Sequence, residues 1–380
     1  MTGPTRTRNR NLRTPYAPVA ALAGLALALA ACAPRSQEVG PRLDAPRIEA
    51  DAIIAADGAR LPLRSWLPEG DARAVVLGVH GFNDYGHGFA MPAAVWAEAG
   101  IAVYAYDQRG FGAGPAPGLW PGVDALVGDL AEAARVVGAR HPGTPLYLVG
   151  ESMGGGVVMS ALARGLVPEA EGAVLVAPAV WGRQTMNAFY RAALWLAAHT
   201  VPWATVTGEG LDITPSDNEA MLRALSADPL VIKNTRIDSL WGVVDLMDSA
   251  LAAAPAIETP LLVLYGARDE VIPEAPTQRM ICALNGRRTV AVYPDGWHML
   301  LRDLQAEVVD RDVIAWIEQR PRRLPSGADS NLARFADCGA APDAVRRGRR
   351  RAGAHAATGP RRPPPGSPPR RHRARRGRRR

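Results

Sequence analysis

The chain has 380 residues, of which 48% are hydrophobic and 21% are charged, a composition that excludes wholesale disorder. Its formal net charge of +7 would by itself suggest binding to nucleic acid or to an anionic surface. The charge is unevenly distributed, however. Residues 321–380 contain 18 Arg and 3 Asp, residues 1–31 contain 4 Arg and no acid, and residues 32–320 carry 22 basic and 34 acidic side chains. The body of the chain is therefore acidic, and a nucleic-acid partner is not expected.

The first 31 residues have the features of a secretory signal peptide. Four Arg precede an unbroken run of small and apolar residues from Val19 to Cys32, which has the usual length of a signal sequence. The run is short for a membrane-spanning helix, which needs about 20 apolar residues. We therefore expect residues 1–31 to be a targeting segment rather than part of the fold.

The end of that run, Leu29-Ala30-Ala31-Cys32, resembles the lipobox of bacterial lipoproteins. The resemblance implies cleavage before Cys32 and attachment of a diacylglyceryl group to its thiol. The alternative is an ordinary signal peptide, in which Cys32 has no special role. We expect a protein of the bacterial cell envelope that is anchored to a membrane through the lipid on Cys32 and faces the periplasm or the exterior. Residues 32–46, which contain Pro and Gly, would then be the tether.

Residues 47–320 alternate between strand-like and helix-like segments. Ile48–Ala55 and Arg60–Leu67 flank Asp57-Gly58, which predicts a hairpin. Short runs that are apolar on both faces then alternate with helical patterns, which predicts an α/β fold with a mostly parallel, doubly wound sheet. The later strands are expected at Ala74–Val79, Ile101–Tyr106, Leu146–Val149, Ala173–Val176, Pro260–Tyr265 and Thr289–Tyr293, and the helices near 90–99, 123–140, 153–165, 275–284 and 303–318.

One interval interrupts this alternation. Residues 181–254 contain no convincing strand between those predicted near 173–176 and 260–265, and they are rich in aromatic residues. We interpret residues 180–255 as a mostly helical cap inserted over the carboxyl edge of the sheet, where ligands bind in such folds. The apolar stretch Met186–Ala197 is either an acyl-binding lid that also touches the bilayer or a helix packed on the core.

The main chemical signal is a strand followed by G-x-S-x-G and a helix. In Gly150-Glu151-Ser152-Met153-Gly154, the two glycines allow the sharp strand-to-helix turn that exposes a nucleophilic serine. Ser152 is therefore the candidate nucleophile, and Gly150 and Gly154 shape its turn. A serine hydroxyl reacts well only when a histidine takes its proton and a carboxylate orients that histidine.

Two later strand ends supply these partners. Asp269 and His298 each come shortly after a predicted strand, so that Ser152, Asp269 and His298 are expected on loops at one edge of the sheet. Asp269 is the candidate acid and His298 the candidate base. Glu270, next to Asp269, is the only serious rival for the acid.

A tetrahedral intermediate also needs two backbone N–H donors aimed at its oxyanion. One is expected from Met153, directly after the nucleophile. The other is expected from Phe82 in the turn His80-Gly81-Phe82, which follows the predicted strand Ala74–Val79.

Taken together, these motifs resemble the monoacylglycerol lipase and lysophospholipase branch of the α/β-hydrolases, over about residues 47–319. The resemblance implies the α/β-hydrolase fold, the roles given above to Ser152, Asp269, His298, Phe82 and Met153, and a lid near residues 180–255. Arg109 is expected to tie loops together rather than to act in catalysis. The matching motifs are His80-Gly81, Asp107-Gln108-Arg109-Gly110-Phe111-Gly112, Gly150-Glu151-Ser152-Met153-Gly154-Gly155, Asp228-Pro229-Leu230-Val231, Gly266-x-x-Asp269-x-Val271-x-Pro273 and Gly296-x-His298.

Beyond Arg320 the hydrophobic periodicity stops. Residues 321–380 consist largely of Arg, Pro, Gly and Ala and are expected to be a disordered tail. Such a tail would bind anionic lipid or polyanions, or it is a frame-shift or read-through product of GC-rich coding DNA. The sequence has no CxxC and no Cys/His cluster, so neither a metal nor a cofactor is expected.

The expected function is that of a membrane-anchored serine hydrolase. It would cleave carboxylic esters of lipid-like substrates, of the monoacylglycerol or lysophospholipid type, through an acyl-enzyme on Ser152. Within the same triad an aminopeptidase, a thioesterase or an acyltransferase remains open. Outside catalysis, the alternatives are an envelope lipoprotein that uses the fold for binding and a polyanion-binding protein led by its tail.

Overall fold

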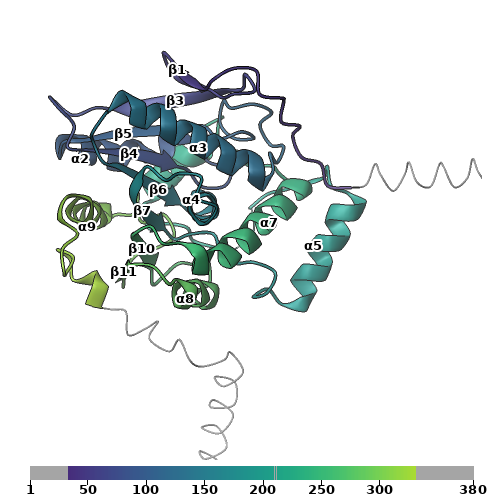
Figure 1. The fold of residues 1–380 in the computed structure, drawn as a ribbon. Helices are drawn as coiled ribbons and strands as arrows, with labels where there is room; N and C mark the ends of the chain where they lie inside the picture. The colour runs from purple at the N-terminus through teal and green to yellow at the C-terminus, as the bar shows by residue number, and fades with distance from the viewer. Residues whose placement is uncertain (1–32, 209, 211, 331–380) are drawn as a thin grey trace, which may run out of the picture. The chain divides into compact units, whose positions relative to one another are not determined.

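The computed structural model describes residues 33–208, 210 and 212–330 (Figure 1). These residues contain a nine-stranded sheet in the order β1-β2-β3-β5-β4-β6-β7-β10-β11. From β4 and β5 onward the neighbouring strands are parallel, as expected, and the first strands are antiparallel. The strands are β1 (Arg47–Glu49), β2 (Ala52–Ile54), β3 (Arg60–Trp66), β4 (Ala74–Val79), β5 (Ile101–Tyr106), β6 (Leu146–Glu151), β7 (Ala170–Val176), β10 (Leu261–Gly266) and β11 (Arg288–Tyr293).

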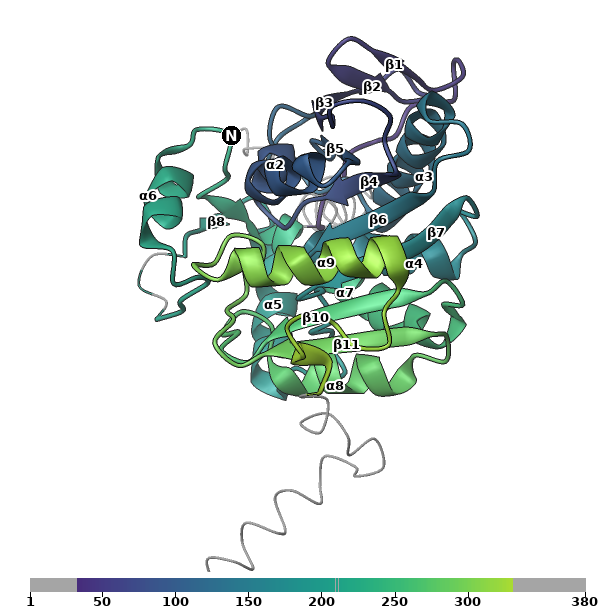
Figure 2. The ribbon, with the colours of Figure 1, turned by 90° about the vertical axis from the view of Figure 1, so that its left-hand side faces the viewer.

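Two helical layers cover the sheet. One hydrophobic cluster joins the sheet to α3, α4, α7 and α8, and a second joins its other face to α2 and α9. Figure 2 shows α2 and α9 in front of the strands. The strands from β4 to β10 are buried along almost their whole length, because both faces of the sheet are covered. The helices are α2 (Ala90–Glu98), α3 (Val123–Arg140), α4 (Met153–Ala163), α7 (Ile237–Ala253), α8 (Glu274–Ala283) and α9 (Ala306–Gln319), with 3-10 turns at Gly86–Phe89 and Ala254–Ala256.

The predicted strand Ile48–Ala55 is wrong in one respect, because it is two strands. The chain reverses at Ala50, whose φ of 44° lies in the left-handed region, so that β1 pairs antiparallel with β2. The pattern of apolar residues did not reveal this turn, since Ala50 is a residue type that rarely adopts such a conformation. The hairpin predicted at Asp57-Gly58 is confirmed by the antiparallel pairing of β2 with β3.

The interval after β7 contains α5 (Ala188–Thr200), α6 (Glu219–Ala227) and, contrary to the expectation of no strand, the short strands β8 (Thr205–Val206) and β9 (Thr235–Arg236). The predicted boundary near 255 is also wrong. Helix α7 packs directly on α4, and its Leu246 side chain is fully buried beside Gly156. It therefore belongs to the helical layer of the core, and the cap proper ends before Ile237.

Helix α5 lies on the outside of the molecule. Only Ala198 is buried, whereas the exposed fractions of Phe189, Trp195 and Leu196 are 75%, 55% and 58%. Helix α5 also contacts α7, a helix of the core layer, so both interpretations of this stretch, as a lid that touches the bilayer and as a helix packed on the core, stay predictions. An apolar helix surface of this kind is uncommon on a soluble protein that has no partner.

The predicted start of the tail at residue 321 is wrong as well. Leu324 and Ala328 are buried in the second hydrophobic cluster, and the backbone N–H of Ser326 donates to Asp312 of α9. These apolar residues, although few, cover the end of α9. The rest of the proposed tail, 331–380, lies outside the described residues, as do the signal peptide and Cys32. In the part of the chain that the structure describes, no helix is both long and apolar enough to cross a membrane.

A buried acid on α9 gives the fold a specific pH dependence. Burial raises the pKa of Asp310 to about 7, whereas an aspartate in an unfolded chain titrates near pH 3.9. The folded state therefore holds this proton more tightly. The contribution of Asp310 to the free energy of unfolding should fall as the pH rises from about 4 to about 7, by at most ~1.4 kcal/mol per pH unit.

We predict that Asp310→Asn, which cannot ionise, is more stable than the parent above about pH 7 and shows a flatter pH dependence. Thermal melts between about pH 5 and pH 8 provide the measurement. Asp71→Asn, at an exposed loop position, is the control and should follow the parent. A parent and an Asp310→Asn variant with parallel curves would show that Asp310 is ionised throughout.

Candidate active site

Ser152 lies in the turn between β6 and α4 with φ 51° and ψ −115°. A non-glycine residue at positive φ costs about 1–3 kcal/mol and persists only where its surroundings enforce it. Here the backbone N–H of Ser152 donates to Val176 at 2.9 Å, and its carbonyl accepts from Ala179 at 2.8 Å. Both partners lie at the end of β7 or just after it, so the neighbouring strand holds the serine in this conformation.

The glycines of the turn are required by close backbone contacts, as the sequence suggested. A Cβ on Gly154 would lie 1.9 Å from the carbonyl oxygen of Val79, and one on Gly150 would lie 2.6 Å from the backbone of Gly154. Gly155 similarly approaches Pro178. The start of α4 is thereby pressed against the ends of β4 and β6, which positions its first N–H groups beside Ser152.

Asp269 and His298 are brought together by the ends of β10 and β11. The Nδ1 atom of His298 lies 2.9 Å from Oδ2 of Asp269, and both side chains are almost fully buried. The second carboxylate oxygen of Asp269 accepts the backbone N–H groups of Val271 and Ile272 at 2.8 and 2.9 Å. This carboxylate is therefore held by three donors. When His298 is neutral, its proton sits on Nδ1 and Nε2 is left as a base.

The rival acid is placed elsewhere. The side chain of Glu270 accepts the backbone N–H of Thr214 from the cap, at 2.6 Å. Ser152, Asp269 and His298 follow parallel strands and lie at the same edge of the sheet. Among the described residues, a hydrogen bond joins His298 to Asp269, and none joins Ser152 to His298.

The predicted oxyanion loop lies next to Ser152. A Cβ on Gly81 would be 3.5 Å from Cβ of Ser152, so the peptide that leads to Phe82 passes beside the serine. The Phe82 ring packs edge-on against Phe111 and also contacts Trp120. Met153 is fully buried at the first position of α4, where backbone N–H groups have no partner within the helix.

His80 secures this loop from behind. It is fully buried, and burial lowers its pKa, so it is neutral. Its Nδ1 donates to the carbonyl of Gly81 at 2.8 Å, and its Nε2 accepts the backbone N–H of Gln108 at 3.0 Å. The Gln108 side chain in turn donates to the carbonyl of His80. The D-x-R-G-x-G loop therefore holds the backbone that carries Phe82.

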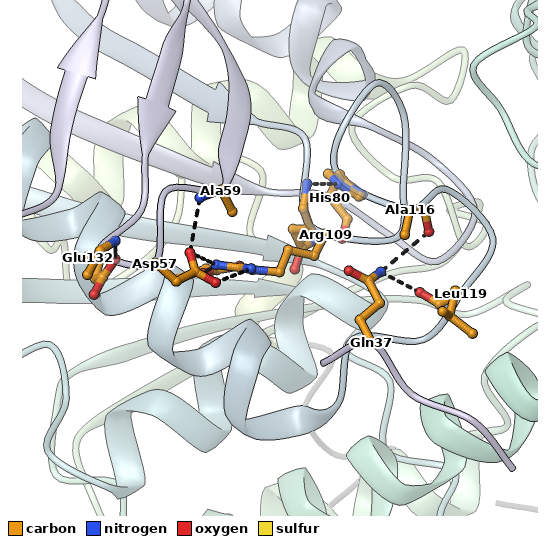
Figure 3. A network of polar contacts seen from close by, with 11 residues as sticks. Gln37, Asp57, Ala59, His80, Arg109, Ala116, Leu119 and Glu132 are labelled. Carbon is orange, nitrogen blue, oxygen red and sulfur yellow. Dashed lines mark hydrogen bonds and ion pairs between the residues drawn. The ribbon is translucent and has the colours of Figure 1, made fainter. Parts of the chain in front are cut away.

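Arg109 of the same loop is structural, as predicted. It makes paired hydrogen bonds to Asp57 and to Asp129, all between 2.7 and 2.9 Å. Figure 3 shows the pair with Asp57. Burial would lower the pKa of Arg109, but the two carboxylates outweigh this effect and raise it. The pair ties the β2–β3 turn to α3 and to the loop that supports the oxyanion donors.

Sequence reasoning missed a buried ionic cluster behind the nucleophile. Arg302, four residues after His298, lies 2.8 Å from the Asp84 carboxylate and 3.0 Å from the carboxylate of Glu151, the neighbour of Ser152. All three side chains are less than 10% exposed. The cluster connects the oxyanion, nucleophile and histidine loops. The sequence feature that could have revealed this cluster is Glu151, an acidic residue at the end of an otherwise apolar strand.

Sequence reasoning also missed how tightly the cap is joined to these loops. Ser216 of the cap donates to Asp303 at 2.6 Å, and the other oxygen of Asp303 accepts the backbone N–H of Trp297, next to His298. Another cap residue, Asp228, accepts a hydrogen bond from the Tyr85 hydroxyl at 2.6 Å. The cap therefore contacts the histidine, acid and oxyanion loops through separate hydrogen bonds.

A parallel sheet with a strained serine turn, a buried Asp–His pair and a glycine loop at one edge is the architecture of the α/β-hydrolases. The model of the Hydrolase_4 family, described as serine aminopeptidase, S33, matches residues 70–305, and the chain belongs to this family.

Individual relatives show which members of this family the chain resembles. It is 28% identical over 269 residues to a monoacylglycerol lipase of Mycolicibacterium smegmatis, covering 70% of this chain and 95% of that protein. It is 22% identical over 281 residues to the human monoglyceride lipase, covering 70% and 90%. A solved structure of a soluble variant of Saccharomyces cerevisiae monoglyceride lipase is similar, with a TM-score of 0.61 at 20% identity over 76% of this chain and 99% of that one. The protein is a hydrolase of the monoacylglycerol lipase-like branch.

The close approach at Gly154 generates a prediction. In Gly154→Ala the methyl group would meet the Val79 carbonyl, which is backbone and cannot move away. We expect a loss of stability of about 1–3 kcal/mol or more, together with loss of hydrolytic activity. The measurement is urea unfolding combined with an ester hydrolysis assay. Gly128→Ala in α3 is the control, because a Cβ at this position would meet no neighbouring atom within 4 Å. It should be neutral or slightly stabilising. Wild-type behaviour of Gly154→Ala would contradict the described turn.

Proposed function

We propose that the protein is a membrane-anchored serine hydrolase that cleaves carboxylic esters of lipid-like substrates through an acyl-enzyme on Ser152. The observation that carries the proposal is the 2.9 Å contact between His298 and Asp269, at the edge of the sheet where Ser152 is held at positive φ. The roles follow from this arrangement, because Asp269 orients the base and leaves Nε2 of His298 free to take a proton.

In the first half of the reaction, Ser152 Oγ attacks the ester carbonyl carbon while His298 Nε2 takes the hydroxyl proton. The carbonyl oxygen becomes an oxyanion, for which the N–H groups of Phe82 and Met153 are the donors. The carbon–oxygen bond of the ester then breaks, and His298 passes its proton to the departing alcohol. In the second half, water repeats these steps on the acyl-enzyme and releases the carboxylic acid.

A lipid-like substrate is supported by two observations. The relatives described above, from three organisms, are named monoacylglycerol lipase or monoglyceride lipase. In addition, α5 exposes Phe189, Trp195 and Leu196, carries Arg191 and contains no acidic residue. An apolar helix with a basic residue suits contact with a lipid surface. We assign to α5 the role of the membrane-facing element of the cap.

Our central prediction concerns the nucleophile. A fluorophosphonate probe should label the parent, and Ser152→Ala should lose both the labelling and at least about 10³-fold in kcat/KM on esters. Ser65→Ala, an exposed serine on β3, is the control and should keep both. Undiminished labelling of Ser152→Ala would refute the assignment, and an inert parent would favour a non-catalytic binding protein.

The same assay discriminates among substrates. Monoacylglycerols, lysophospholipids, short p-nitrophenyl esters, acyl thioesters and aminoacyl p-nitroanilides are compared at equal concentrations. We expect the highest kcat/KM on monoacylglycerol-type esters. A preference for the p-nitroanilides would instead identify an aminopeptidase, and a preference for the thioesters a thioesterase. Acyl transfer to added alcohols that outpaces hydrolysis would identify an acyltransferase.

The anchoring is tested separately. Cys32→Ser should release the protein from the membrane fraction into the soluble fraction, because the thiol that would carry the diacylglyceryl group is absent. Fractionation followed by detergent phase partition provides the measurement, and mass spectrometry of the mature N-terminus identifies the modification. Retention of Cys32→Ser in the membrane would exclude the lipobox assignment while leaving the hydrolase assignment intact.

A further inference from the structure

The segment that precedes the first strand is fixed to the body of the enzyme. We call residues 33–44 the N-terminal strap. Its Gln37 donates through the backbone to the carbonyl of Trp120 at 2.8 Å and through Nε2 to the carbonyl of Leu119 at 2.6 Å. Figure 3 shows the Gln37 side chain pointing into the loop that carries Ala116 and Leu119. These contacts are unexpected for a segment that the sequence presents as a flexible tether.

Further along, the strap is held at a second place. Arg42 forms an ion pair with Glu132 of α3 at 2.6 Å, and the backbone N–H of Leu43 donates to Ala56 at 2.7 Å. Glu132 is itself buried and also accepts the backbone N–H of Ala56. The strap thus rests on the same buried network, through Ala56 and its neighbour Asp57, that positions Arg109.

The loop that holds Gln37 lies beside both the active site and the cap. The Trp120 ring contacts Phe82 of the oxyanion loop, and it packs so closely on α7 that a Cβ on Gly242 would meet it at 2.3 Å. The preceding residue of α7, Trp241, contacts His199 of α5 with 5.2 Å between the ring centroids, and His199 stacks on Trp195 with 4.7 Å between the centroids. A continuous series of contacts therefore leads from Gln37 to the exposed surface of α5.

Chain length limits how far Cys32 can lie from the docked Gln37. Cys32 comes five residues before Gln37, and five extended residues span at most about 18 Å. In Figure 1 the described chain begins on the side of the molecule that carries α5. A lipid on Cys32 and the apolar residues of α5 would therefore be held on the same side of the protein.

From these contacts we infer that the N-terminal strap is a mount, by which we mean a fixed connection between the lipid anchor and the enzyme. It orients α5 and the active-site entrance toward the membrane that holds the anchor. The inference rests on the proposed lipidation of Cys32. A flexible tether of the same length would give proximity to the membrane but no orientation. A strap bound at Gln37 and Arg42 leaves only residues 33–36 between Cys32 and the first docked residue, so the anchor and α5 contact one bilayer together. The partner of the α5 surface is thus the bilayer, and the substrate enters from it.

The test separates membrane-borne from soluble substrate. Full-length lipidated enzyme is reconstituted into phosphatidylethanolamine–phosphatidylglycerol vesicles that contain monooleoylglycerol, and the same samples are assayed with soluble p-nitrophenyl butyrate. Two variants abolish the fixed orientation in different ways. Q37A combined with R42A breaks the side-chain contacts, and a Gly/Ser insertion of about twelve residues between Arg35 and Ser36 leaves the strap bound but lengthens the free chain.

Both variants should lose at least about fivefold in rate on monooleoylglycerol while staying within about twofold of the parent on the soluble ester. Protection of α5 from hydrogen exchange on vesicles should fall in parallel. Arg60→Ala, which removes an exposed ion pair with Asp51, is the control and should match the parent on both substrates.

Full vesicle activity in both variants would overturn the inference, because orientation would then be irrelevant. Equal losses on both substrates would also overturn it, since the strap would be needed only for stability. Fractionation of the parent distinguishes a failure of the mount from a failure of the proposed membrane anchoring. A parent that carries no lipid on Cys32 removes the anchoring proposal and the mount with it, whereas an anchored parent with unaffected variants removes the mount alone.

Discussion

The close contact between the start of α4 and the end of β4 is the constraint on which the site depends. Gly154 lies so near the Val79 carbonyl that no side chain fits, and Ser152, two residues earlier, is held at a φ of 51° by its backbone hydrogen bonds with Val176 and Ala179. The same contact brings the N–H of Met153 and the loop at Gly81 to the serine. Backbone geometry, enforced by packing of the sheet, therefore accounts for the nucleophile and for the two proposed oxyanion donors.

Around this turn, buried polar groups connect loops that are distant in the sequence. Arg302 links Glu151 to Asp84, and Asp303 links the histidine loop to Ser216 in the cap. Each of these four buried charged groups has an opposite charge or a hydrogen-bond donor close by, which offsets the cost of its desolvation. The cap therefore helps to hold the active-site loops in position. Its outer helix, α5, keeps an exposed apolar surface.

Much of the architecture was predictable from local pattern. The parallel strands, helix α3 over residues 123–140 and the proximity of Asp269 to His298 were all anticipated, because apolar runs and motif order reflect a buried sheet directly. The turn at Ala50, the packing of α7 on α4 and the docking of residues 321–330 were not anticipated. Each depends on which surfaces meet in three dimensions, and a local pattern carries no information about that.

The sequence alone determined the class of protein, since the order of Ser152, Asp269 and His298 and the glycines around the serine are local features with a chemical reason. It also showed that the net charge of +7 belongs to the two ends and that the body is acidic. Only the tertiary structure decided that α5 is exposed and that the segment before β1 is bound along the body. Both depend on long-range contacts, such as that of Gln37 with Leu119, which form once the sheet and its helices have assembled.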